Sequence, residues 1–199
     1  MSEIMELTNG ELVILINDNL LILEGGCFKM MISTKMVKAI NEQVAAEWGS
    51  YYIYLAMSYK LKAMSLPILA QWFYLQDGEE KMHAEKMANY ILDQGGEVEL
   101  LAIPAPKADW KKVADICKET VAHEIMITNR IHDLVTLADK EKDFATRSFL
   151  QWFVDEQVEE VATARELQDI VKMSEPSGQM LMLENRVQQL VAARTVTPA

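Results

Sequence analysis

The sequence predicts an all-α protein, a four-helix bundle with one long crossover and a short fifth C-terminal helix. Apolar side chains recur every three or four positions through four long segments of similar length. Only a few residues separate the first segment from the second and the third from the fourth, whereas about 13 residues join the second to the third. Eight glycines and five prolines among 199 residues leave little room for a turn-rich all-β fold.

The composition is that of an ordinary globular chain, half apolar and one quarter charged, of one domain or one domain with an appendage. Nineteen basic and 30 acidic residues give a net charge of −11, which argues against nucleic-acid or anionic-membrane partners. Two cysteines are too few for a disulfide framework and suit a reducing compartment. The acidic start is unlike a signal peptide, and no apolar run is long enough to span a bilayer.

Residues 1–30 differ from the rest and form an N-terminal extension that two interpretations fit. Apolar runs at 13–16 and 20–23, separated by Asn and Asp residues, predict a small β-hairpin. The alternative hypothesis is a mis-annotated start, because Glu24-Gly25-Gly26 can be encoded by a purine-rich run that resembles a ribosome-binding site shortly before Met30 and Met31. The N-terminal mass of protein made from its native gene separates the two interpretations, since a mass that includes Met1 or Ser2 excludes the late start. A single domain over 31–199 follows the extension.

The helices are expected in the following order. The first spans 34–63. Ser65 is the expected N-cap of the second, which has Pro67 in its first turn and ends near Gln94 before a Gly-Gly C-cap. Residues 95–107 form the extended crossover, which is long enough, at about 40 Å, to run the length of the bundle. Asp109 is the expected cap of a third helix ending near 138, the fourth runs from about 143 to 173, and the fifth follows a break at 175–178 and ends near 193.

Each long helix has one apolar seam that is interrupted near its middle by polar residues. These interruptions fall at a similar depth, so folding brings together Glu47, Glu80, His83, Glu124, Gln157 and Glu160. Taking an ionised carboxylate out of water costs several kcal/mol, and no Lys or Arg lies on a seam near this layer to compensate. Bound cations relieve the cost, and carboxylate oxygens with one imidazole suit iron, manganese or zinc. Glu80 and His83, at i and i+3, share one helical face. The coincidence across four seams predicts a two-metal centre, although one buried Glu or one Glu-x-x-His is more often structural.

Four segments of the chain resemble the metal-site helices of bacterial non-haem ferritins. They are Asn41–Glu47, Glu79–His83, His123-Glu124 and Trp152–Glu160, and the resemblance covers about residues 31–193. It implies that Glu47, Glu80 and His83 hold a first iron, and that Glu80 bridges to a second iron held with Glu124 and Glu160, with Gln157 beside it. It also implies that Tyr54 lies beside the centre as a candidate electron donor, although an ordinary core aromatic is the alternative.

The resemblance further implies a third, inward-lying iron site at Glu79, Glu156 and Glu159, with Glu160 shared. The spacing places these side chains near one side of the bundle. The alternative to a third iron site is an acidic surface that only water contacts.

This sequence differs from bacterioferritins and animal ferritins at several site positions, and these differences bear on haem binding and on iron entry. Bacterioferritins carry a second Glu-x-x-His on the last long helix and a haem-ligating Met after the bridging Glu, whereas this chain has no histidine in 156–159 and has Lys81 at the Met position. We therefore expect no haem. Arg147 and Leu150 stand where animal ferritins carry channel carboxylates, which argues against that iron-entry route. His123 and His132 lie off the seams and are expected at the surface.

The resemblance implies iron storage and detoxification by a cytoplasmic ferroxidase. Two Fe(II) ions each lose an electron to O2 or H2O2, and the ferric product is stored in a homo-oligomeric cage of twenty-four subunits. Two alternatives stay open. One is a di-iron oxidase or peroxidase that mainly consumes oxidant, and the other is a structural shell subunit with a degenerate site.

Overall fold

The computed structural model describes residues 3–6, 12–16, 19–23, 32–174 and 180–196. The chain divides into two units, Met1–Met31 and Ile32–Ala199. In the first, β1 (Glu3–Glu6), β2 (Leu12–Ile16) and β3 (Asn19–Leu23) form an antiparallel sheet in the order β1-β2-β3. The sequence indicated the β2–β3 pair but not β1, which is only four residues long. A translation start at Met30 or Met31 stays a prediction.

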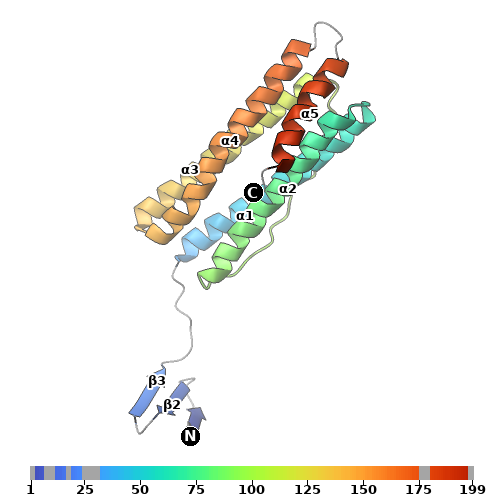
Figure 1. The fold of residues 1–199 in the computed structure, drawn as a ribbon. Coiled ribbons are helices and arrows are strands. Elements are labelled where there is room, and N and C mark those ends of the chain that lie inside the picture. Colours follow the sequence, from blue (N-terminus) through green and yellow to red (C-terminus); the bar gives the residue numbers. More distant parts are fainter. Residues whose placement is uncertain (1–2, 7–11, 17–18, 24–31, 175–179, 197–199) are drawn as a thin grey trace. The chain divides into compact units, whose positions relative to one another are not determined.

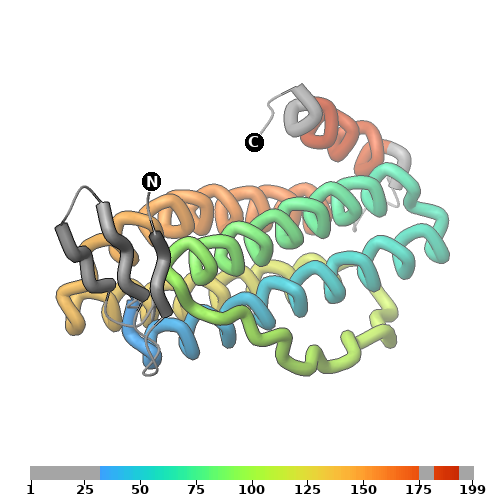
Figure 2. The backbone as a smooth tube through the Cα atoms, turned by 90° about the horizontal axis from the view of Figure 1, so that it is seen from below, coloured from blue at the N-terminus to red at the C-terminus, as the bar shows by residue number. Residues whose placement is uncertain are grey.

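The second unit is the predicted helical bundle (Figures 1 and 2). Its helices are α1 (Thr34–Ala63), α2 (Pro67–Asp93), α3 (Val113–Glu141), α4 (Phe144–Ser174) and α5 (Met180–Val196). The all-α prediction is confirmed for this unit. The segment between α2 and α3 runs along the bundle in Figure 2. The Asn41 side chain of α1 fixes the start of this crossover, since its amide donates to the Glu97 carbonyl at 3.0 Å and accepts from the Glu99 N–H at 2.9 Å.

Two of the predicted N-caps are wrong. Ser65 has a left-handed backbone (φ 62°), and α2 begins after Leu66, which gives no side-chain cap. Asp109 lies outside α3, which begins after Lys112, again without a side-chain cap. A Ser or Asp near the start of a helix therefore predicts the first helical residue poorly where a distant side chain or an extended connection sets that start. The third helix also continues to Glu141, three residues beyond the predicted end, and closes on Lys142 in the left-handed conformation (φ 56°).

A carboxylate from α5 provides the missing cap of α2. The Ile68 and Leu69 N–H groups donate to the two oxygens of Glu184 at 2.8 and 2.9 Å. These N–H groups belong to the first turn, which has no partners within the helix, and a negative charge there is favourable. The contact therefore fastens the fifth helix to the start of α2.

Replacing Glu184 by alanine is expected to lower the free energy of unfolding by about 1–2 kcal/mol, because two first-turn N–H groups lose their acceptor. Urea unfolding of the full chain measures this difference. Replacing the exposed neighbour Asn185 by alanine is the control and should stay within about 0.5 kcal/mol of wild type. Equal losses in the two variants would mean that the cap contributes nothing.

Two buried apolar clusters fill the bundle, one toward each end. One includes Tyr54, Phe73, Trp110 and Leu167, and the other includes Ile40, Met87, Ile131 and Phe153. Between these clusters lie buried polar and charged residues: Glu47, Gln76, Glu80, His83, Glu124, Gln157 and Glu160. The fold thus concentrates charge at mid-height of an otherwise apolar core.

Candidate metal centre

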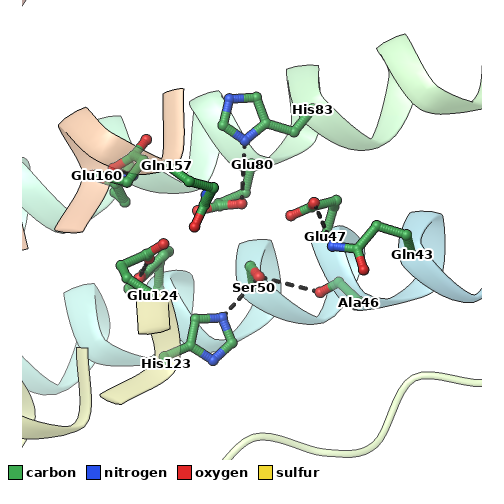
Figure 3. Close-up of polar contacts among 12 residues, drawn as sticks. Gln43, Ala46, Glu47, Ser50, Glu80, His83, His123, Glu124, Gln157 and Glu160 are labelled. Carbon is green, nitrogen blue, oxygen red and sulfur yellow. Dashed lines mark hydrogen bonds and ion pairs between the residues drawn. The ribbon is translucent and has the colours of Figure 1, made fainter. Parts of the chain in front are cut away.

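The structure brings Glu47 of α1 together with Glu80 and His83 of α2. Ligand atoms of these three side chains lie within 4.8 Å of one another, and each residue is only 1% exposed. The Nδ1 atom of His83 lies 3.5 Å from one oxygen of Glu80. In Figure 3 these side chains point into the space between the helices. The separation of i and i+3 puts Glu80 and His83 on one face, as the sequence predicted.

The opposite side of this space is formed by α3 and α4, which contribute Glu124, Gln157 and Glu160 (Figure 3). All three are buried. The Tyr54 hydroxyl donates a hydrogen bond to Glu124, and Gln76 donates to Glu160 at 2.7 Å. The Gln157 side-chain oxygen accepts a hydrogen bond from Thr128 at 2.8 Å. Gln157 is therefore held in place by its neighbour on α3.

Several ligand-type atoms at the centre have no hydrogen-bond partner among the described residues. They are one oxygen of Glu47, both oxygens of Glu80 and Nε2 of His83. Buried polar groups are normally satisfied, and leaving them unpaired costs about 1–3 kcal/mol each. Buried oxygens of Glu47 and Glu80 that lack a partner, next to the His83 imidazole, form a donor set that suits a metal ion.

The electrostatics agree with this description. Burial raises the pKa of Glu80 well above its usual value, and the nearby charges of Glu124, Glu47 and Glu160 raise it further. Burial also raises the pKa of Glu47, while Gln43 and Arg130 oppose the rise. The pKa of His83 is lowered to about 4 by burial and by the charge of Lys86, so its imidazole is neutral at pH 7 and is able to bind a metal.

The metal-free protein is expected to become more stable as the pH falls through the raised pKa of Glu80. The folded state then takes up a proton at Glu80, while the unfolded carboxyl, with an ordinary pKa near 4.5, stays ionised. The lowered pKa of His83 acts in the opposite direction as the pH falls through the ordinary histidine value of 6.5, because the unfolded histidine gains a proton first. Melting curves of chelator-treated protein at several pH values, for wild type and for Glu80→Gln, separate the two contributions. If Glu80→Gln keeps the full increase in stability on acidification, Glu80 is not its source.

The acidic residues expected at the third site are less enclosed. Glu79 and Glu156 are half-buried and Glu159 is exposed. The pKa of Glu156 is raised by burial and by the charge of Glu159, while Lys86 opposes the rise. Glu156 and Glu159 thus lie close enough to repel each other.

The prediction that His123 is a surface residue is wrong, whereas His132 is exposed as predicted. His123 is half-buried, with its Nε2 2.8 Å from the Ser50 hydroxyl and its ring edge-on to Tyr54 at 5.7 Å. Burial lowers the pKa of His123 to about 4. The seam pattern missed it because a side chain that flanks a seam reaches the core from the side.

Sequence reasoning also missed Gln43 and Arg130. Gln43 donates to Glu47 at 2.7 Å, and Arg130 of α3 donates to the Gln43 side-chain oxygen at 2.7 Å. The position of Gln43, one turn before Glu47, was the only available signal, whereas nothing in the sequence pairs α1 with Arg130.

Comparison with known proteins agrees with the fold and the centre. A ferritin-like domain model matches residues 37–173. Bacterial non-heme ferritins from Staphylococcus haemolyticus and Staphylococcus aureus strain MRSA252 are each 38% identical, over 133 and 132 residues, or 67% and 66% of this chain and 80% of each relative. An open-pore ferritin from the archaeon Archaeoglobus fulgidus superimposes with a TM-score of 0.77 at 39% identity, covering 79% of this chain and 98% of that one. A humanized archaeal ferritin gives 0.77 at 37% identity, with 79% and 97% covered.

The bundle and its buried carboxylate–histidine cluster define a metal-binding four-helix protein of the type that holds its ions between facing helices. The chain belongs to the ferritin family. Its function is accordingly that of the family, the oxidation and storage of iron.

Among the described residues, no helix combines the length and apolarity that a membrane span requires.

Proposed function

We propose that this chain is a non-haem ferroxidase subunit that oxidises Fe(II) at a two-iron site and delivers the product to a store. The observation that carries the proposal is the buried cluster of Glu47, Glu80 and His83, in which one ligand atom from each residue lies within 4.8 Å of the others and carboxylate oxygens have no hydrogen-bond partner. Glu47, Glu80 and His83 bind the first substrate ion. Glu80 also reaches the second ion, which Glu124 and Glu160 bind with Gln157 beside it. Carboxylate oxygens favour Fe(III) over Fe(II), so the site itself promotes oxidation.

The electrons and protons balance with either oxidant. Two Fe(II) ions supply two electrons, which with two protons convert O2 to H2O2 or convert H2O2 to two molecules of water. The acidic groups of the site are poor proton stores once iron is bound, since bound cations keep carboxyls ionised. Hydrolysis of the ferric product supplies the protons. Tyr54, hydrogen-bonded to Glu124, lies beside the centre as a candidate electron donor to an oxidant that takes more than the two electrons of the iron pair.

Three finer assignments belong to the same proposal. Glu79, Glu156 and Glu159 bind a third iron with Glu160, on the more open side of the centre. The active form is a cytoplasmic cage of twenty-four copies. No haem is bound, since Lys81 pairs with Glu85 at 3.6 Å on the exposed side of α2, at the position of the bacterioferritin Met.

Aerobic addition of Fe(II) to the purified chain, followed by size separation with iron detection, tests the proposal. We expect oxidation well above the buffer rate and iron that co-elutes with a very large particle. Fast oxidation with iron lost as a precipitate would instead favour an oxidase or peroxidase that mainly consumes oxidant. Oxidation at the buffer rate would contradict the ferroxidase assignment and leave a structural shell subunit.

A further inference from the structure

A hydrogen-bonded connection links the metal centre to a cation on a different helix. Arg130 of α3 donates from Nε to the side-chain oxygen of Gln43 at 2.7 Å, and the amide nitrogen of Gln43 donates to Glu47 at 2.7 Å. A second Arg130 nitrogen donates to the backbone carbonyl of Glu42 at 2.8 Å. Two donors on one rigid guanidinium thus hold this part of α1.

The orientation of the Gln43 amide is set by its two partners, Arg130 and Glu47. An amide side chain has a donor end and an acceptor end, and its orientation is set by its partners. Arg130 has only donors, so it requires the Gln43 oxygen to face it, and the amide NH2 is then directed at Glu47. Without Arg130 the amide oxygen loses its charged donor, and the Gln43 side chain is then held at Glu47 by one hydrogen bond alone.

The consequence falls on the two oxygens of Glu47. One oxygen is occupied by the Gln43 amide, and the other is buried without a hydrogen-bond partner in the cluster with Glu80 and His83. Groups that bind the outer side of a metal ligand fix its orientation and commonly change metal affinity by about 10–100-fold when removed. From this arrangement we infer that Arg130 is a positioning residue of the first iron site and acts through Gln43 to hold Glu47 in its binding orientation. The inference rests on the proposed function of this centre.

The surroundings of Arg130 make the inference testable by substitution. Arg130 lines an open groove of about 190 Å³ between α1 and α3, with Glu42, Asp133 and Leu134 among its other lining residues. Its side chain is half-buried, so a shorter or uncharged replacement leaves space that water is able to fill. Variants at this position are therefore expected to fold, and melting curves check that they do.

The experiment is an air-free titration of the full chain with Co(II), followed by its visible absorption, which reports both affinity and ligand geometry. Arg130→Met is expected to bind Co(II) at least about 10-fold more weakly than wild type, with an altered spectrum. The direction of the change in Co(II) affinity is decisive, because removing a nearby positive charge would by itself strengthen cation binding. Tighter or unchanged binding in Arg130→Met would overturn the inference. Arg130→Lys keeps the positive charge but not the paired guanidinium donors that reach Gln43 and Glu42 together. It is expected to keep only part of the Co(II) affinity.

The route through Gln43 is tested with Gln43→Leu and the double variant. If Arg130 acts through Gln43, the double variant binds Co(II) no more weakly, within about 2-fold, than Gln43→Leu alone. Fully additive losses would show that Arg130 acts by another route. Asp133→Asn, in the same groove, is the matched control and should leave the Co(II) spectrum unchanged. Failure of wild type to bind Co(II) would contradict the proposed function itself, whereas wild-type binding that Arg130→Met leaves intact contradicts only this inference.

Discussion

Replacing Glu80 by glutamine is expected to slow the initial oxidation of Fe(II) by at least about 100-fold, because both ions of the proposed centre lose a negatively charged ligand. The same substitution is expected to stabilise the metal-free protein at pH 8 by about 2 kcal/mol, or roughly 4–8 °C in melting temperature. The reason is that it removes the charge most strongly opposed by burial and by three neighbouring carboxylates. Stopped-flow oxidation and calorimetry measure the two effects.

Glu85→Gln is the matched control for this experiment. Glu85 lies on the same helix but is exposed, and its ion pair with Lys81 at 3.6 Å is at the surface. Its replacement should change neither the oxidation rate nor the melting temperature appreciably. An oxidation rate unchanged in Glu80→Gln would contradict the role of Glu80 as a ligand, and a variant less stable without metal would contradict the predicted relief of charge repulsion.

Replacing Phe153 by alanine is expected to lower the free energy of unfolding by about 3–5 kcal/mol. Phe153 is 2% exposed, and its ring lies edge-on to His83 at 5.9 Å and to Phe149 at 5.4 Å. The cavity left behind also frees one side of the His83 ring. We therefore expect weaker Co(II) binding as well as a lower urea midpoint.

Phe144→Ala on the same helix provides the comparison. Phe144 is 76% exposed, so its loss should change stability by no more than about 0.5 kcal/mol. Should Phe153→Ala cost no more than Phe144→Ala, the cluster around His83 would contribute little to stability. Unchanged Co(II) affinity in a destabilised Phe153→Ala would show that the imidazole is oriented by other contacts.

Much of the helical unit followed from the sequence, for reasons visible at particular residues. The apolar period located α1 at its observed bounds, and Gly95, with a positive φ of 76°, marks the end of α2 as predicted. The helix starts were harder to predict from the sequence, because Glu184 caps α2 from more than 110 residues away. Pairing of that kind depends on tertiary structure and leaves no local pattern.

The candidate centre shows the same division. Glu47, Glu80 and His83 lie on seams, and the seams predicted their meeting. Gln43 contacts Glu47 from a flanking position, and Arg130 and His123 contact the neighbours of the centre, at positions where a polar residue is by default a surface residue. The assignment of ligands to each ion stays a prediction, which the Co(II) spectra and the Glu80→Gln variant address.

The charged layer that separates the two apolar clusters has a consequence for the lifetime of the protein. Without bound cations like charges face one another at the middle of the bundle, between its two apolar clusters, and this repulsion opposes packing there. Bound ions reverse this and join the four helices at mid-height. We expect amide hydrogen exchange near Glu80 and Glu124 to slow sharply on metal binding. Subunits that carry iron would then resist proteolysis, while empty ones would be removed first, so that the amount of protein follows the supply of its cargo.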